Sequence, residues 1–188
     1  MLVGLGREYL GVKNGHVEKY IEGGVHEVVV SDNREDVVVE AGDRVDRKFT
    51  FCRLTTERDT SLAISDAEEE GYGDDPAREE HGVSCYLGAK ITVGNDLYGT
   101  VCFVDSEPRT ESFTPEERTF VELIARLLGY QLESRGYEEE IDRREKELRL
   151  KNRAMDEAPV GITIADADGG EMPLVYVNDE FLEITGYA

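Results

Sequence analysis

The sequence is poor in positive charge, and in lysine above all. Lysine and arginine number 21 against 42 aspartates and glutamates, which gives a formal net charge of −21, and only six of the basic residues are lysines. Such a field repels phosphate backbones and anionic membrane surfaces, so we expect this segment to bind neither nucleic acid nor membrane. The lysine-poor acidic composition favours a halophilic source, where molar salt screens self-repulsion, over an ordinary acidic protein.

Long apolar runs and cysteines are also scarce. No run of 18 apolar residues exists, and Met1-Leu2-Val3 does not begin a signal peptide, so we expect no membrane span. The three cysteines, Cys52, Cys85 and Cys102, are odd in number and lie in separate apolar stretches. This usage predicts a cytoplasmic, reducing location rather than a disulfide framework. Buried apolar packing is favoured for them over thiol sensing or ligand attachment.

Sequence motifs of catalysis and metal binding are missing. The sequence has no G-x-x-x-x-G-K-[ST], no G-x-S-x-G and no H-E-x-x-H, and it contains no complete kinase domain or helix-turn-helix. The histidines His16, His26 and His81 are scattered without ligand spacing, so surface or strand positions are favoured, although Cys52 and His81 could converge in space. We therefore predict no enzyme and no metal site in this segment.

An acidic stretch follows residue 65. It lacks the spacing of a calcium loop, so a solvated loop is favoured over a cation site, with a role as a lid as the alternative. Its acids are Asp66, Glu68, Glu69, Glu70, Asp74 and Asp75.

The longest feature runs from Thr114 to Asp156. It contains no proline after Pro115, and Thr114-Pro115-Glu116-Glu117 predicts a capped helix start. If helical throughout, it would reach roughly 65 Å, too long for one small domain, so we interpret it as a connecting helix. Steps of three and four residues give a mostly apolar stripe, which predicts a coiled coil. The stripe positions are Phe120, Leu123, Leu127, Tyr130, Ser134, Tyr137, Ile141, Arg144, Leu148, Lys151 and Met155. From Phe120 to Leu128 we expect them to pack on a sheet.

Strand-like runs alternate with short helical ones before this helix. The order predicts an α+β domain with an antiparallel sheet and helices packed on it. The expected elements are a helix at 7–12, a turn at Asn14-Gly15, a hairpin of strands 16–21 and 25–31 across Gly23-Gly24 that ends at Asp32-Asn33, a strand at 37–41, a helix or covering segment at 48–56, a strand at 61–64, a helical turn at 76–80, and a second hairpin of 83–93 with 98–104.

The chain after the helix is short. We expect strands at 160–165 and 174–177, a turn at 166–171 and a helix at 181–185. Two strands and one helical turn cannot bury a core, so 158–188 is interpreted as the truncated start of a second domain.

Five segments of the first part, in this order, resemble a GAF domain of archaeal and bacterial multi-domain sensors. They are Phe51–Thr55, Ala63–Ala67, Gly82–Ile91, Tyr98–Asp105 and Phe113–Glu117. The resemblance divides the chain into a GAF domain at 1–132, a coiled-coil signalling helix at 133–157 and the start of a further domain at 158–188. It implies a curved antiparallel sheet whose covering helices enclose a cleft for a small molecule.

The last part is similar to the start of a PAS domain. The matching segments are Ala158–Asp166, Pro173–Asn178 and Phe181–Tyr187, and Pro-Leu-Val-Tyr-Val-Asn resembles the flavin-binding, light-sensing subclass. In that subclass the flavin-reactive cysteine would lie beyond Ala188. The resemblance therefore implies flavin only if the domain continues, whereas the GAF segment requires no cofactor.

The GAF resemblance implies a set of candidate pocket residues. They are Phe51, Cys52, Arg53, Asp66, Ser84, Cys85, Tyr86 and Tyr98. Arg53 would pair with an anionic ligand, or with a local carboxylate if Phe51 and Tyr86 are only core. A homodimer is expected through Leu127, Tyr130, Ser134, Tyr137, Ile141, Leu148 and Met155 of the long helix.

Together these features predict a cytoplasmic sensory and relay module. It would pass a cue from the GAF cleft through a dimeric helix to a PAS domain and then to a histidine kinase of a two-component system, or to a transcription regulator of the bacterio-opsin-activator type. The alternatives are a thiol redox enzyme related to free methionine sulfoxide reductases, and a GAF spacer without a ligand.

Overall fold

The computed structural model describes residues 2–34, 39–166 and 173–186. By their contacts these residues fall into two units, Met1–Ser134 and Arg135–Ala188. Among the described residues, no helix is long and apolar enough to cross a membrane.

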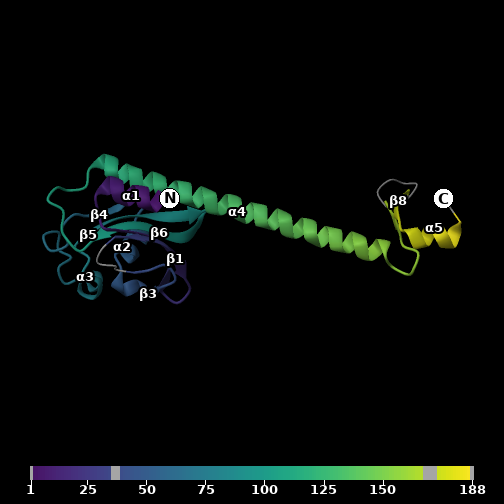
Figure 1. The fold of residues 1–188 in the computed structure, drawn as a ribbon, viewed down its shortest axis with the longest axis horizontal. Helices are drawn as coiled ribbons and strands as arrows, with labels where there is room; N and C mark the ends of the chain where they lie inside the picture. Colours follow the sequence, from purple (N-terminus) through teal and green to yellow (C-terminus); the bar gives the residue numbers. More distant parts are fainter. Residues whose placement is uncertain (1, 35–38, 167–172, 187–188) are drawn as a thin grey trace. The chain divides into compact units, whose positions relative to one another are not determined.

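The first unit is built on a six-stranded antiparallel sheet in the order β3-β2-β1-β6-β5-β4. Helices α1 and α4 lie along one face, and α2 and α3 lie on the other (Figure 1). The predicted α+β fold is thereby confirmed. The strands are β1 (Asn14–Ile21), β2 (Val25–Asn33), β3 (Arg44–Asp46), β4 (Leu62–Ile64), β5 (Cys85–Val93) and β6 (Asp96–Asp105); the helices are α1 (Leu2–Leu10), the 3-10 helix η1 (Arg47–Phe49), α2 (Cys52–Thr56), α3 (Pro76–His81) and α4 (Pro115–Asp156).

Two apolar cores form because successive side chains of a strand point to opposite faces. On the α1/α4 face, Val17, Leu87 and Phe103 pack with Val121 and Ile124 of α4. On the α2/α3 face, the pleat places a second cluster that contains Phe51, Cys52, Ile64, Tyr86, Cys102 and Val104. The sheet therefore separates the apolar core beneath α1 and α4 from the α2/α3 face, which also carries the polar residues described below.

Both predicted hairpins are present. Gly23 and Gly24 both have positive φ, 91° and 78°, as a tight turn between β1 and β2 requires. Residues 94–95 join β5 to β6, with Gly94 at φ 59°. The short helices expected near 48–56 and 76–80 are confirmed as η1, α2 and α3.

The predicted turn at Asn14-Gly15 is wrong. Both residues belong to β1, where Gly15 pairs with Phe103 of β6. A Cβ at Gly15 would press on Val3 of α1 and on the Phe103 ring, so glycine stands here to let the helix approach the strand. The helix expected at 7–12 in fact begins at Leu2 and ends at Leu10.

Three further boundaries in β2 and beyond need correction. Asp32-Asn33, expected to end the second strand, are its last paired residues. The strand predicted at 37–41 lies partly outside the described residues, and Val39–Ala41 are not in a strand. Ala41 instead donates its N–H to the Ser31 hydroxyl at 3.1 Å, and the strand that pairs with β2 is β3, which the sequence analysis missed.

Helix α4 begins with the predicted capping box. The Thr114 hydroxyl accepts from the Glu117 N–H at 3.2 Å, and the Glu117 carboxylate accepts from the Thr114 N–H at 2.8 Å. Its 42 residues correspond to about 63 Å.

The face by which α4 packs differs from the expected stripe. Val121, Ile124 and Ala125 are buried against the sheet, whereas Leu123 and Leu127 are exposed. The segment from Phe120 to Leu128 lies on the sheet as expected, and Phe120 packs against the core, but the expectation is wrong for the stripe positions Leu123 and Leu127. This segment has two apolar faces that are offset by one residue. The sheet covers the face of Val121 and Ile124 and leaves the face of Leu123 and Leu127 exposed.

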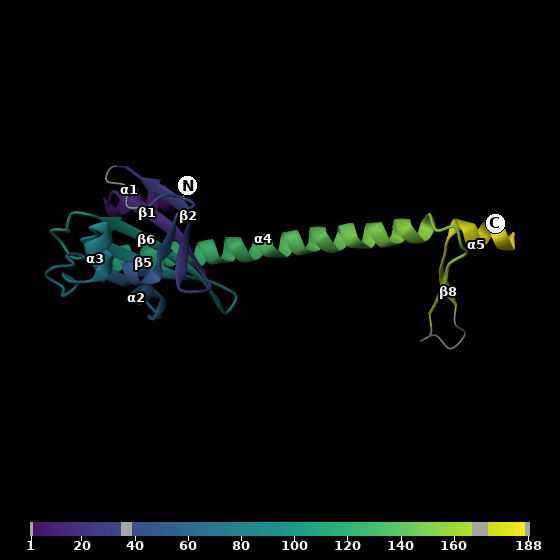
Figure 2. The ribbon, with the colours of Figure 1, turned by 90° about the horizontal axis from the view of Figure 1, so that it is seen from below.

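The second unit contains the hairpin of β7 (Thr163–Ala165) and β8 (Leu174–Val177), followed by α5 (Asp179–Thr185). Figure 2 shows β8 leading into α5. Asn178 is buried and caps α5 through Oδ1, which also accepts from the Ile162 N–H, while Nδ2 donates to the carbonyls of Met155 and Val160. The turn expected at 166–171 lies, apart from Asp166, outside the described residues.

Thr114→Ala is expected to lower the free energy of unfolding by about 1 kcal/mol, because it removes the side-chain half of the capping box. Urea denaturation followed by circular dichroism measures the change. Thr119→Ala is the control, since the exposed Thr119 hydroxyl bonds only its own helix carbonyl at Pro115 and alanine is the better helix former. Equal losses in both variants would contradict this role of the cap.

Candidate functional site

A cavity of about 30 Å³ lies on the α2/α3 face of the sheet. Its polar lining comes from β1, α2, α3, β5, β6 and the connection from η1 to α2, and consists of His16, Glu18, Thr50, Cys52, His81, Tyr86 and Cys102. The apolar lining is Val39, Val45, Phe49, Phe51, Ala77, Val83 and Val104. Its volume corresponds to one or two water molecules.

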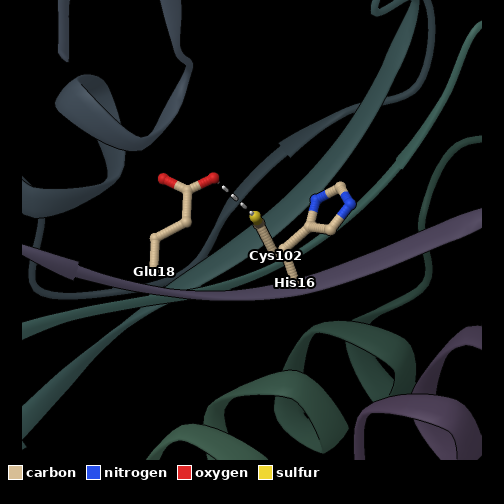
Figure 3. A group of neighbouring side chains, drawn as sticks. All are labelled: His16, Glu18 and Cys102. Atoms are coloured by element: carbon tan, nitrogen blue, oxygen red, sulfur yellow. Dashed lines mark hydrogen bonds between the residues drawn. The ribbon is translucent and has the colours of Figure 1, made fainter. Parts of the chain in front are cut away.

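Strand geometry brings the polar residues together. His16 and Glu18 are two apart on β1, so they point to the same face, and Cys102 of β6 lies directly opposite His16 in the antiparallel pairing. Figure 3 shows the three side chains gathered on this face. A β-bulge between Val17 and Glu18 shifts the register with β2 at this point.

Glu18 is the centre of a buried hydrogen-bond network. Its Oε2 lies 3.0 Å from Nδ1 of His26, and its Oε1 lies 3.8 Å from Sγ of Cys102, which donates to it (Figure 3). The Cys102 sulfur is also 3.8 Å from the sulfur of Cys52, which begins α2. All four residues are buried.

A second set of contacts fixes the surroundings of this network. The Tyr86 hydroxyl donates to Sγ of Cys52 at 3.5 Å and lies 2.6 Å from the Thr55 hydroxyl. Gly88, two residues along β5, leaves room for that hydroxyl, which a Cβ would meet. On the other side, Nε2 of His16 lies 2.9 Å from Oδ1 of Asn33.

The charges of the network compensate one another. Burial opposes ionisation of Glu18, but its hydrogen bond with His26 and the charge of that ring hold the pKa of the carboxyl below its ordinary value. Burial likewise opposes the charged form of His26, yet its hydrogen bonds with Cys52 and Glu18 raise its pKa to about 9. Desolvation lowers the pKa of His16.

The two sulfurs share one contact and differ in acidity. The hydrogen-bonded contact with Cys102 lowers the pKa of Cys52 against the effect of burial, whereas the same contact and burial raise the pKa of Cys102 well above its ordinary value. Cys52 is therefore the more acidic thiol of the pair, and it lies beside the His26 ring. Thiol, imidazole and carboxyl groups thus meet in one buried volume.

Three of the predicted pocket residues line this cavity: Phe51, Cys52 and Tyr86. Arg53 forms an ion pair with Asp75, the residue that caps α3, which is the local carboxylate foreseen as the alternative to an anionic ligand.

The other four predicted residues lie elsewhere. Cys85 is buried on the α1/α4 face because it is one residue out of phase with Tyr86, and Tyr98 packs against that same core. Asp66 lines a separate surface pocket, where its side chain accepts from the N–H groups of Glu68 and Glu69. Ser84 donates its backbone N–H to the Asp105 carbonyl.

His16 and Glu18 were not predicted as pocket residues, nor His26 as the buried partner of Glu18, and Cys102 was considered only as an isolated thiol. The pattern His-x-Glu at 16–18 on a predicted strand was the available signal, because it puts two ionisable groups on one face. Cys52 and His81, considered as residues that could converge, do line the same cavity.

Comparison with known proteins identifies the fold around this site. A family model described as GAF domain matches residues 2–132. Similar solved structures include the phycocyanobilin-bound GAF domain of a cyanobacterial phytochrome, at 16% identity and a TM-score of 0.60 over 72% of this chain and 82% of that one. The blue-light absorbing form of the Thermosynechococcus elongatus PixJ GAF domain gives 19% identity and a TM-score of 0.61 over 74% of this chain and 85% of that one. At these identities the likeness shows the fold.

A further match is local. The chain is 59% identical over 44 residues to the bacterioopsin transcriptional activator of Halobacterium salinarum (strain ATCC 700922 / JCM 11081 / NRC-1). The matched segment covers 23% of this chain and 6% of the activator. The chain therefore matches a small part of that relative's length.

Cys85 is expected to resist alkylation in the folded protein. Burial raises the pKa of its thiol to about 12, and at pH 8 such a thiol is thiolate in only about one molecule in ten thousand. Iodoacetamide at pH 8 followed by peptide mass spectrometry should leave Cys85 unmodified in native protein and modify it fully in guanidinium chloride. Rapid labelling of Cys85 in the native state would contradict the described burial.

Proposed function

The chain belongs to the GAF domain family, and on that premise we propose that it is the sensory and signal-relay part of a signal-transduction protein. The cleft on the α2/α3 face receives the cue, and α4 passes the change onward. The observation that carries the proposal is a cavity lined by ionisable groups on strands whose opposite face holds α4.

The cavity and α4 are coupled through neighbouring residues of β6 and β1 that face opposite sides of the sheet. Cys102 faces the cavity, and its neighbour Phe103 faces the other core, in the same cluster as Ile124 of α4. Val17, between His16 and Glu18, likewise points into that cluster. A ligand that displaces these strands by a fraction of an ångström would press on α4, because packed cores transmit strain.

We also propose that α4 pairs with α4 of a second copy. Tyr130, Tyr137, Ile141 and Leu148 are more than half exposed and follow the heptad stripe. Ion pairs at i,i+4 support the helix, and two of them involve the stripe positions Arg144 and Lys151: Glu140–Arg144, Asp142–Lys146, Glu145–Arg149 and Glu147–Lys151. Met155 continues the apolar stripe, whereas the polar Ser134 and the charged Arg144 and Lys151 weaken it, as a switchable coiled coil requires.

The second unit is proposed to begin a PAS domain. Its hairpin and capped helix follow the order of the PAS-like segments, and several apolar side chains are exposed, among them Val160, Leu174, Val175 and Ile184. Similarity to a transcriptional activator supports a transcription-regulator output in a halophile, with a histidine kinase as the other output. The three free thiols support a cytoplasmic location.

The ligand is proposed to be small. The similar solved domains include bilin-bound ones, but a cavity of about 30 Å³ has no room for a tetrapyrrole. A thiol redox enzyme is the second candidate function, favoured by the 3.8 Å approach of Cys52 and Cys102. It is less supported than sensing, because both sulfurs are only 1% exposed and a substrate would have to reach them.

The dimer is tested by a pair of leucines two residues apart on α4. Leu148 lies on the stripe and Leu150 on the opposite side of the helix, and they are 59% and 69% exposed. Leu148→Asp is expected to give the mass of one chain in light scattering at high salt, whereas Leu150→Asp keeps the mass of two. A monomeric parent chain, or equal behaviour of both variants, would reject the paired helix.

Ligand binding separates a sensor from a spacer. A compound that binds the cleft, added at a concentration of about one hundred times its Kd, should stabilise the folded chain by about 2.7 kcal/mol. The stabilisation is measured as a rise in melting temperature. Ala77→Val, which narrows the cavity, should abolish the shift. If a broad panel of small metabolites, ions and redox compounds leaves the melting temperature unchanged, the spacer alternative is favoured.

A further inference from the structure

We propose that the cleft binds one divalent transition-metal ion of the Zn²⁺ type through His16, Glu18, Cys52 and Cys102. This inference rests on the proposed sensory function, since it names an occupant of the same cleft.

The donor atoms converge to coordination distance. His16, Glu18 and Cys102 form one group whose ligand atoms all lie within 4.8 Å of one another, and Glu18, His26 and Cys52 form a second such group. Glu18 belongs to both, so the two groups meet at its carboxylate. A single ion beside that carboxylate would lie within reach of both thiolates.

The spacing of the sulfurs fits a tetrahedral ion. Two thiolates at about 2.3 Å from a tetrahedral Zn²⁺ lie about 3.8 Å apart. The Sγ atoms of Cys52 and Cys102 are separated by 3.8 Å, and Sγ of Cys102 is 3.8 Å from Oε1 of Glu18. Coordination would therefore require little movement of these three donors.

The imidazole of His16 is held as a ligand would be. Its Nε2 lies 2.9 Å from the Asn33 carbonyl oxygen, and the Asn33 amide donates to the Val39 carbonyl at 2.7 Å. The first contact places the ring proton on Nε2 and leaves the Nδ1 lone pair free. Figure 3 shows the other ring nitrogen on the side of the Cys102 sulfur.

His26 acts outside the coordination sphere in this arrangement. It bonds Glu18 Oε2 at 3.0 Å and so orients the carboxylate, with Oε1 toward Cys102. Its buried Nε2 has no hydrogen-bond partner among the described residues. Five ionisable side chains in a sealed core cost folding free energy, and a bound cation offsets that cost.

The donor set selects the class of metal. Two thiolates with one imidazole and one carboxylate suit Zn²⁺ or Co²⁺, whereas Mg²⁺ and Ca²⁺ prefer oxygen ligands. The acidic stretch from Asp66 to Asp75 offers carboxylate oxygens without thiol or imidazole donors, so it does not match the donor set that this class of metal prefers.

The test uses the full chain, purified under reducing conditions and stripped with a chelator. Titration with Co²⁺ should produce thiolate-to-cobalt charge-transfer absorption that saturates at one ion per chain, and Zn²⁺ should displace it. Cys102→Ala and Cys52→Ala should each lower the affinity at least tenfold, and His16→Gln should lower it with both thiols retained. Cys85→Ala is the matched control, because Cys85 is an equally buried thiol in the other core.

Three outcomes would overturn the proposal. The first is the absence of the charge-transfer band with reduced thiols and a native circular dichroism spectrum. The second is binding that persists in both Cys52→Ala and Cys102→Ala, which would mark cations held by the acidic surface. The third is a Cys52–Cys102 disulfide that forms on mild oxidation while the reduced chain binds no metal. In each case the sensory proposal is judged separately, by light scattering and by ligand-induced thermal shift.

Discussion

The pleat of the two central strands is the constraint on which the rest of this structure depends. Because side chains alternate along β1 and β6, Val17 and Phe103 must face the helices if His16, Glu18 and Cys102 face the cleft. One strand pair thus carries an apolar surface that anchors α4 and a polar surface that forms the site. A shift of one residue in register would exchange the two sets and destroy both.

Much of the fold could be predicted from local patterns. The two hairpins have glycine turns, α4 has a capping box, and β5 and β6 are long runs of β-forming residues, so each signal lies within a few neighbouring residues. The predictions were wrong where the local structure depends on contacts between residues far apart in the sequence. The sequence around Gly15 is typical of a turn, but glycine is needed there because Val3 and Phe103 lie too close to allow a Cβ. Strand β3 has only three residues, too few to give a recognisable strand pattern, and it is defined by its pairing with β2.

The candidate site shows the same limit more sharply. Phe51, Cys52 and Tyr86 were identified through family resemblance, and they do line the cavity. His16, Cys52 and Cys102 are far apart in the sequence, and only the pairing of β1 with β6 and the docking of α2 bring them together. On α4, two apolar faces offset by one residue gave no local reason to prefer Val121 and Ile124 over Leu123 and Leu127.

The edges of the sheet have a consequence for how copies of the chain can associate. Its outermost strands, β3 and β4, are three residues long, and each already pairs on its inner side. So short an edge offers few backbone groups to a further strand, which is how natural sheets resist unwanted growth. Addition of a further strand to this six-stranded sheet is thereby disfavoured, so contacts between copies of the first unit would have to use side-chain surfaces rather than backbone pairing at the sheet edge.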